Sequence, residues 1–159
     1  MKKKVSMTAA LRVLKQGKVD YTVHCYDYVE KGGTASSSSA LGFDEHVVIK
    51  TLVMEDESKK PLIVLMHGDR QVSLKGLARH IGVKTIRPCE AKSAERHSGY
   101  KTGGTSPFGT RKVLPVYCEE SILSLDKIVI NGGGQGLLVE IAAKDLLEIL
   151  DLERVNVAI

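Results

Sequence analysis

The chain has 159 residues, the length of one domain that can bury a core of its own. Its 43% hydrophobic and 26% charged residues are ordinary globular values, and an aromatic share of 4% without Trp argues against a stacking platform for single-stranded nucleic acid. Three cysteines without CxxC spacing offer neither a disulfide framework nor a zinc site, and no apolar run approaches a membrane span. The basic start Met1–Lys4 leads into a segment too short and polar for a signal peptide. We therefore expect a cytoplasmic protein without a membrane segment, forming one domain over residues 1–159 with a core of about 8–150.

Positive charge is concentrated in the middle of the chain. Ten Lys or Arg and two acids fall between Arg70 and Lys112, so this segment carries +8. Since the whole chain carries +4, the remainder carries −4. Such a segment is typical of a protein that binds a polyanion such as RNA, although a solvated helical face accounts for Lys75, Arg79 and Lys84 taken alone.

The predicted elements begin with a helix over residues 9–16, which Thr8 caps and Gly17 ends. A strand over 21–29 follows, and Tyr26 lies on the face that carries polar-tipped rings, where its ring either lines a pocket or satisfies a buried carbonyl. The Gly- and Ser-rich segment over 31–40 indicates a flexible edge or lid that leads into a short helix.

A single lysine interrupts the apolar strand predicted over residues 47–54. The alternation of side chains along a strand places Lys50 on the same face as Val48, Leu52 and Met54. A lysine is almost never fully buried without a partner. Lys50 therefore either reaches solvent at the end of the strand or points into a pocket where a ligand supplies the negative charge.

The rest of the chain mixes strands and helices without a regular βαβα order. A strand over 61–67 completes a hairpin, Ser73 caps the next helix, and Pro115 indicates an edge strand or a bulge. The last helix is expected to bury Leu146, Leu147 and Leu150. The later segments predict helices over 74–81, 91–97 and 143–150, strands over 84–87, 113–118, 127–130 and 137–141, and a tight turn or pocket wall over 131–136. This order predicts an α+β domain with a mixed, mostly antiparallel sheet and helices packed around it.

The segment GYKTGGTSPFG over residues 99–109 contains four glycines, which do not suit the interior of a helix or strand. Pro107 removes one donor and pushes Ser106 toward extended geometry. The amides of Gly103, Gly104 and Thr105 are therefore expected to face outward, where they would bind an oxyanion. A plain surface turn is the alternative interpretation.

The usual catalytic motifs are missing from the sequence. It contains no GxSxG or HExxH segment, and its five histidines lie far apart without acid-rich or cysteine-rich neighbours. No cysteine lies beside an activating histidine or a helix start. We therefore predict no bound metal and no cofactor, and we expect each histidine to be structural or solvated.

Four features together resemble the YbaK family of free-standing aminoacyl-tRNA deacylases: the strand VVIKTLV, the loop GYKTGGTSPFG, the segment GGGQGLLVEI and a leucine-rich terminal helix. The resemblance runs from about Thr8 to Leu150 and extends to the editing domain of bacterial prolyl-tRNA synthetases. It implies a cytoplasmic editing protein that removes mischarged amino acids, most typically Cys from tRNA(Pro), on a mixed sheet curled toward a barrel.

The resemblance also implies roles for individual residues. Lys50 matches the lysine that holds the terminal phosphate or the aminoacyl group, and Gly103 and Gly104 match glycines whose amides polarise the ester carbonyl. The implied substrate-binding positions are Tyr26, Thr105, Ser106, Pro107 and Asn131. In cysteine-specific members the substrate's own thiol is implied to attack the ester, so that the enzyme needs no nucleophile. The implied partners are aminoacyl-tRNA and, as an option, prolyl-tRNA synthetase.

Two positions depart from the cysteine-specific pattern, because Asn131 stands where a serine is usual and Leu138 where an aspartate is usual. Clearance of Ala or another small residue is therefore an open alternative. A non-catalytic module that binds tRNA or a synthetase is another, and it would show salt-sensitive binding without turnover. A nucleotide or phosphate-ester enzyme is disfavoured by the lack of an acidic cluster for magnesium.

Overall fold

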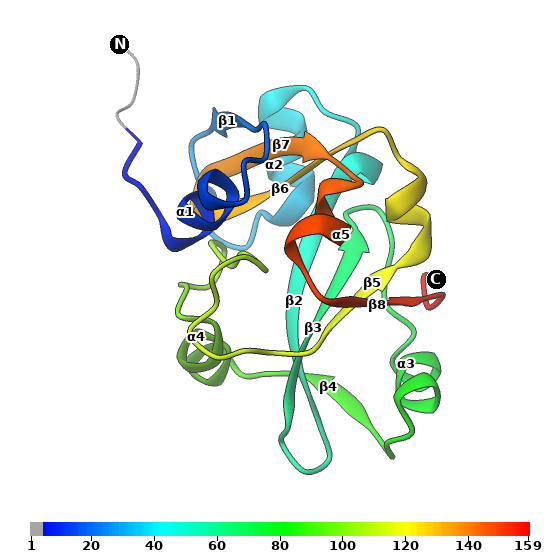
Figure 1. Ribbon diagram of the computed structural model, residues 1–159. Coiled ribbons are helices and arrows are strands. Elements are labelled where there is room, and N and C mark those ends of the chain that lie inside the picture. The colour runs from blue at the N-terminus through cyan, green and yellow to red at the C-terminus, as the bar shows by residue number, and fades with distance from the viewer. Residues whose placement is uncertain (1–4) are drawn as a thin grey trace.

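The structure, a computed structural model, describes residues 5–159, so the prediction made on Met1–Lys4 lies outside the described residues. Five helices and eight strands follow one another as in Figure 1. The helices are α1 (Ala9–Gln16), α2 (Gly33–Leu41), α3 (Leu74–Ile81), α4 (Ala91–Ser98) and α5 (Asp145–Ile149), with short 3₁₀ helices η1 (Glu45–Val47) and η2 (Glu120–Ser124). The strands are β1 (Thr22–Cys25), β2 (Val48–Asp56), β3 (Pro61–His67), β4 (Ile86–Pro88), β5 (Val116–Glu119), β6 (Lys127–Gly134), β7 (Leu137–Ala142) and β8 (Leu152–Val155). Over residues 5–159 no helix is both long and apolar enough to cross a membrane.

All eight strands belong to one mixed sheet, which confirms the α+β prediction. The order is β1-β7-β6-β2-β3-β5-β8, and β4 pairs with β2 beside this path. The pairs β1/β7, β6/β7, β2/β3 and β2/β4 are antiparallel, whereas β2/β6, β3/β5 and β5/β8 are parallel. The path ends at β1 and β8, so the sheet does not close into a barrel.

Two helices have the bounds that their capping residues predict. The Thr8 hydroxyl accepts a hydrogen bond from Leu11 N at 3.0 Å, and Gly17 ends α1. Ser73 accepts from Gly76 N at 3.1 Å, and Gly82 ends α3 with a left-handed φ of 87°. These bounds follow from the sequence because each cap satisfies backbone groups within one turn of itself.

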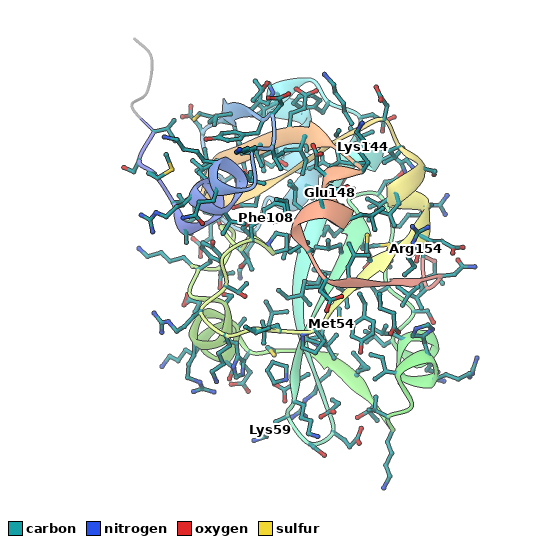
Figure 2. The ribbon with its side chains drawn as sticks, viewed as in Figure 1. Met54, Lys59, Phe108, Lys144, Glu148 and Arg154 are labelled. Atoms are coloured by element: carbon teal, nitrogen blue, oxygen red, sulfur yellow. The ribbon has the colours of Figure 1, made fainter. Side chains whose placement is uncertain are left out.

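The hairpin of β2 and β3 runs through the middle of the molecule and separates its apolar clusters (Figure 1). Ile49 and Val53 pack into the main cluster, where Phe108 is fully buried beneath α1 (Figure 2). On the opposite face, Val48 belongs to one smaller cluster and Met54 to another. The side chain of Lys50 therefore lies at the boundary between two apolar clusters of one sheet face.

The C-terminal strand β8 was not predicted. Because β8 pairs with β5 in parallel, β5 is an interior strand, and Pro115 precedes it rather than marking an edge or a bulge. The buried core continues past residue 150 to Val155 and Val157, whereas Leu147 is 44% exposed, contrary to its predicted burial. Segment 31–40 also forms most of an ordered helix, α2, rather than a flexible edge.

Val155→Ala should lower the free energy of unfolding by about 2 kcal/mol, because it removes buried methyl groups and leaves a cavity. Val155 is 2% exposed among the side chains that β8 and α3 share. Val113, which is fully exposed, provides the same substitution as a control with almost no expected effect. Urea unfolding measures both variants, and equal effects would show that β8 is not part of the core.

Candidate functional site

The parallel pairing of β2 with β6 ends just before Lys50 and Asn131. Ile49 lies opposite Ile130 in the last pair of this ladder, and Lys50 and Asn131 are the next residues of the two strands. Val48 and Val129, the preceding pair on this face, are packed together in one apolar cluster. The side chains of Lys50 and Asn131 therefore point from adjacent strands to the same side of the sheet.

Asn131 also joins the β6–β7 turn to the glycine loop, residues 99–109. Its Nδ2 donates to Gly103 O at 3.3 Å and to Gly134 O at 3.1 Å. Its Oδ1 accepts from Gly133 N at 2.6 Å and from Gly134 N at 3.1 Å, across the bulge of β6. An amide supplies the donor and the acceptor that this junction needs. The structure thus brings together Asn131 and Gly103, with Lys50 on the same side of the adjacent strand.

Two tyrosines of the segment after β1 border the same region. Tyr26 packs beside Val48 and Leu138, and its amide donates to Gly136 O at 3.0 Å. Burial, and then the neighbouring Tyr28, raises the pKa of Tyr26, so its hydroxyl stays protonated. Leu138 is 5% exposed in this cluster, which makes the wall of the site apolar.

The Tyr28 hydroxyl lies directly against Gly103. A Cβ on Gly103 would lie 2.2 Å from that oxygen, and the φ of 84° is also one that favours glycine. Nothing in the sequence linked Tyr28 to a loop 75 residues later.

The amides of the glycine loop are not all directed outward. Gly104 N donates to Lys101 O at 2.8 Å and closes a turn, so its amide is unavailable to a ligand, which corrects the expectation for this residue. Gly103 N and Thr105 N donate no hydrogen bond within residues 5–159. These two amides are among the donors that the loop leaves free.

Ser106 and Pro107 are buried, contrary to their expected contact with a substrate. The Ser106 hydroxyl accepts from Phe108 N at 3.2 Å, so it closes a turn inside the loop. The neighbouring Phe108 is fully buried, which draws this half of the loop into the core. Ser106 and Pro107 therefore support the loop, and Thr105 remains half-buried at its surface.

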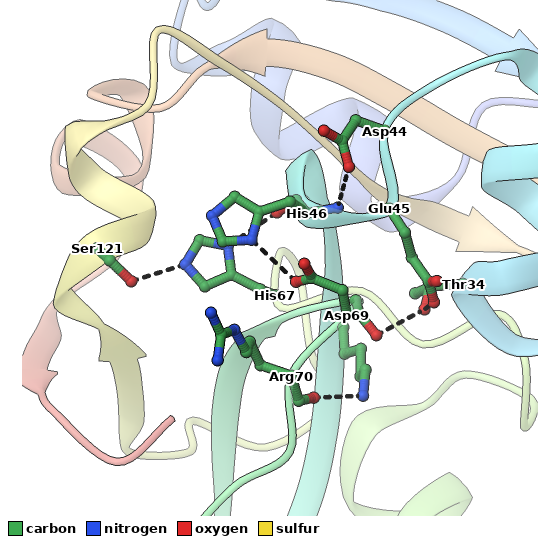
Figure 3. A network of polar contacts seen from close by, with 10 residues as sticks. Thr34, Asp44, Glu45, His46, His67, Asp69, Arg70 and Ser121 are labelled. Carbon is green, nitrogen blue, oxygen red and sulfur yellow. Dashed lines mark hydrogen bonds and ion pairs between the residues drawn. The ribbon is translucent and has the colours of Figure 1, made fainter. Parts of the chain in front are cut away.

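Lys50 is half-buried and faces acids of its own chain, which neither alternative for its position included. Its Nζ donates to Arg70 O at 2.7 Å (Figure 3). Burial lowers the pKa of Lys50, and the carboxylates of Glu45 and then Asp69 partly offset this lowering. The ammonium group is thus held at a fixed acceptor with negative charge nearby.

His46, His67 and Asp69 lie together near Lys50, which the separated histidines of the sequence did not indicate. Their ligand-type atoms lie within 4.8 Å of one another. His67 Nδ1 donates to His46 O at 2.8 Å and Nε2 accepts from Ser121 Oγ at 2.7 Å, so both ring nitrogens are in use. The two rings are stacked at 3.8 Å and 6°, so their in-plane lone pairs cannot converge on one ion. This geometry does not favour a metal centre.

The neutral state of His67 predicts a loss of stability in acid. Burial lowers the pKa of His67 in the folded protein, below the value of about 6.5 expected in the unfolded chain. Below that value the unfolded chain binds the additional proton, so the free energy of unfolding falls as the pH decreases. Urea titrations between about pH 7 and pH 5 should show a smaller slope for His67→Asn than for the parent protein, and an unchanged slope would contradict this assignment.

Cys89 and Cys118 are not activated thiols. Burial raises the pKa of Cys118 to about 12 and that of Cys89 to about 11. Both thiols are therefore protonated near neutral pH, and Cys25 is exposed on β1.

Two hollows flank the glycine loop, and both are lined by Gly99, Tyr100 and Lys101. One, of about 440 Å³, extends to the β6–β7 turn, and the other, of about 400 Å³, extends to α4. The second is bordered by one acid, Glu95, and by four exposed cations, Lys92, Arg96, Lys101 and Arg111. Within residues 5–159 none of these cations forms an ion pair. This second hollow, called the groove below, is therefore suited to an anionic chain. Lys50 lines neither hollow.

A comparison with family models decides the family. The model of the aminoacyl-tRNA editing domain matches residues 31–149, which include Lys50, the glycine loop and Asn131. The chain belongs to the aminoacyl-tRNA editing domain family. The family match confirms the resemblance drawn from the lysine strand and the glycine loop.

The relatives of this editing domain include a free-standing protein and parts of larger ones. Enterococcus faecalis EbsC, named provisionally as a Cys-tRNA(Pro)/Cys-tRNA(Cys) deacylase, is 30% identical over 93% of this chain and 91% of its own length. The proline–tRNA ligase of Shouchella clausii is 26% identical over 72% of this chain, which spans 21% of the ligase. A crystal structure described provisionally as a trans-editing enzyme for prolyl-tRNA synthetase has a TM-score of 0.80 at 19% identity, with 96% of this chain and 98% of that one covered. This last likeness shows the shared fold.

Proposed function

We propose that this editing domain acts in trans as an aminoacyl-tRNA deacylase in the cytoplasm, with mischarged Cys-tRNA(Pro) as its main substrate. The observation that carries the proposal is the hydrogen bond from Asn131 to Gly103, with Lys50 on the same side of the adjacent strand. The name of EbsC and the match to proline–tRNA ligases support the reaction class and the tRNA. Prolyl-tRNA synthetase is the partner that would supply the mischarged tRNA.

The free amides of the glycine loop serve as the oxyanion hole in this proposal. The ester carbonyl would accept hydrogen bonds from Gly103 N and Thr105 N, and each such donor contributes roughly 100- to 1,000-fold to the rate of acyl transfer. Lys50 would hold the terminal phosphate or the aminoacyl group in place. These residues position and polarise the ester, and none of them forms a covalent bond with it.

The attacking group comes from the substrate. The cysteine thiol adds to its own ester carbonyl, a carbon–sulfur bond forms, and the carbon–oxygen bond to the ribose breaks. The thiol proton passes to the departing ribose oxygen, so that a cyclic thioester and a free tRNA end are released. The raised pKa values of Cys89 and Cys118 agree with a site that has no enzyme thiolate.

Alanine is a second candidate for the amino acid, because Leu138 makes the wall of the site apolar. Leu138 packs against Val48 and lies opposite Asn131 on β7. An apolar wall accepts a methyl side chain without an unpaired polar group. Alanine offers no thiol, so in that case water would attack the ester and the products would be free alanine and tRNA.

Direct assays of mischarged tRNAs test the function. Cys-tRNA(Pro), Ala-tRNA(Pro) and Cys-tRNA(Cys) are incubated with the protein, with and without prolyl-tRNA synthetase, and the remaining ester is measured. We expect the fastest cleavage for Cys-tRNA(Pro). Binding of all three without cleavage of any would reject the deacylase and would favour a binding module.

Charge reversal in the groove should weaken tRNA binding. Arg96→Glu/Arg111→Glu is expected to lower tRNA affinity at least about tenfold and to reduce the slope of log affinity against log salt by about 2. Lys75→Glu/Arg79→Glu changes the charge equally on α3, which lies across the hairpin from α4 (Figure 1). Fluorescence anisotropy with uncharged tRNA should show little change for this control. Equal losses in both variants would mean that only net charge matters.

A further inference from the structure

The acceptor that fixes Lys50 belongs to a turn that follows β3. Lys50 Nζ donates to Arg70 O, and Arg70 N donates to His67 O at 3.1 Å, which closes the turn over 67–70. Gly68 N donates to Val48 O at 2.8 Å, two residues before Lys50 on β2. The position of the lysine ammonium therefore depends on the position of this turn.

The turn is pressed against η1 without room for a side chain. A Cβ on Gly68 would lie 2.6 Å from Glu45 O and 2.7 Å from Val48 O. The Thr34 hydroxyl contacts both η1 and the turn, because it lies 2.7 Å from a Glu45 carboxylate oxygen and 3.2 Å from Gly68 O. The turn and η1 are thus packed together and joined by hydrogen bonds.

A series of side-chain contacts also joins the turn to η1. His46 Nδ1 lies 2.9 Å from Asp69 Oδ1, and the His46 ring is stacked on His67, which is 1% exposed (Figure 3). Burial raises the pKa of Asp69, but the hydrogen bond and charge of His46 outweigh it, so the net pKa lies below its usual value. His67 is held in turn by His46 O and by Ser121 of η2.

Two acids act on the Lys50 ammonium from η1 and this turn. The carboxylates of Glu45 on η1 and Asp69 on the turn both favour the charged lysine. Glu45 is fixed by Thr34, whereas the orientation of Asp69, whose side chain is 39% exposed, depends on His46. Among the described residues, His46 is therefore the partner that decides where the Asp69 charge lies relative to Lys50.

We propose that His46 and Asp69 are positioning residues for Lys50: His46 orients Asp69, and Asp69 holds the turn and its own charge where they keep the lysine ammonium fixed and protonated. The inference rests on the proposed function only in giving Lys50 a substrate to hold. It assigns a role to a histidine–carboxylate pair that lies outside the glycine loop and outside the groove.

The direct test is the pKa of the Lys50 amine, which needs no substrate. Lysine labelled with ¹³C at Cε is titrated by NMR, and Lys50→Arg identifies the signal. In Asp69→Asn, which keeps the size and removes the charge, the pKa of Lys50 should fall. In Asp20→Asn, the same substitution at an exposed position before β1, it should not change. An unchanged Lys50 pKa in Asp69→Asn would overturn the inference.

Variants of His46 separate positioning from a loss of structure. His46→Ala removes the donor to Asp69 and should lower the Lys50 pKa, whereas His46→Asn retains a donor near the place of Nδ1 and should restore it. If His46→Ala and His46→Asn gave the same Lys50 pKa as the parent protein, His46 would not position the lysine. If Asp69→Asn did not fold, the two His46 variants would carry the test.

The deacylation assay distinguishes this inference from the proposed function. Asp69→Asn and His46→Ala should lower kcat/KM at least about tenfold at neutral pH and move the alkaline limb of the pH profile to lower pH, since deprotonation of Lys50 sets that limb. A protein that cleaves no ester but shows the expected shifts of the Lys50 pKa would reject the deacylase and retain the positioning pair. A protein that cleaves the ester but whose Lys50 pKa is unchanged in these variants would retain the deacylase and reject the positioning pair.

Discussion

Lys50→Met should abolish ester cleavage while the domain stays folded. The substitution keeps an unbranched side chain and removes the ammonium group from the face shared by Val48, Asn131 and Leu138. Loss of one preorganised electrostatic contact to a reacting ester typically lowers the rate about 100- to 1,000-fold. We therefore expect kcat/KM for Cys-tRNA(Pro) to fall at least about 100-fold in a single-turnover deacylation assay.

The free energy of unfolding should not fall in Lys50→Met, because a half-buried ammonium is replaced by an apolar group beside two apolar clusters. Lys127→Met makes the same change at an exposed position on the neighbouring strand β6 and should leave both activity and stability unchanged. Full activity of Lys50→Met would exclude this lysine from the site.

Gly103→Ala is expected to have an effect of similar size for a geometric reason. The new methyl group would overlap the Tyr28 hydroxyl, and an alanine at a φ of 84° is itself strained by about 1–2 kcal/mol. The loop must therefore shift and carry the free Gly103 amide away from the ester. A displacement of about 1 Å from productive geometry costs roughly 100-fold in rate, so deacylation should fall by about that factor.

Gly82→Ala is the matched control for Gly103→Ala. Gly82 has a φ of 87° at the end of α3, and a Cβ there meets nothing within 4 Å. Both variants should lose similar stability from the backbone strain, but only Gly103→Ala should lose activity. Adding Tyr28→Ala should restore part of that activity by removing the overlap. If Gly82→Ala and Gly103→Ala were equally active, the contact with Tyr28 would have no role in placing the loop.

Local features of the sequence determined much of the fold. The caps of α1 and α3, the hairpin of β2 and β3 and the lysine in an apolar strand all depend on residues within one turn or one strand of each other. Each such feature satisfies backbone groups or presents a face with a fixed period, so it can be read without knowing the neighbours in space. The glycine loop was also evident from its composition.

The strand β8 was missed because its identity depends on a distant partner. Two of its four residues, LERV, are charged and exposed, and only Val155 is buried. The strand is defined by its parallel pairing with β5, and by Glu119, which accepts a hydrogen bond from Val157 N at 2.7 Å. No periodic pattern within so short a segment distinguishes it from a polar tail.

The sequence by itself determined that Lys50 and the glycine loop are unusual and that they resemble one family of enzymes. Only the tertiary structure decided which groups of that loop are free, because the turn at Gly104 and the burial of Ser106 depend on how the loop packs. It also decided that His46 and Asp69 meet beside Lys50, since these contacts join residues about twenty positions apart through the order of the strands. Hydrogen bonds between side chains of different elements follow the sheet's register, which no local pattern encodes.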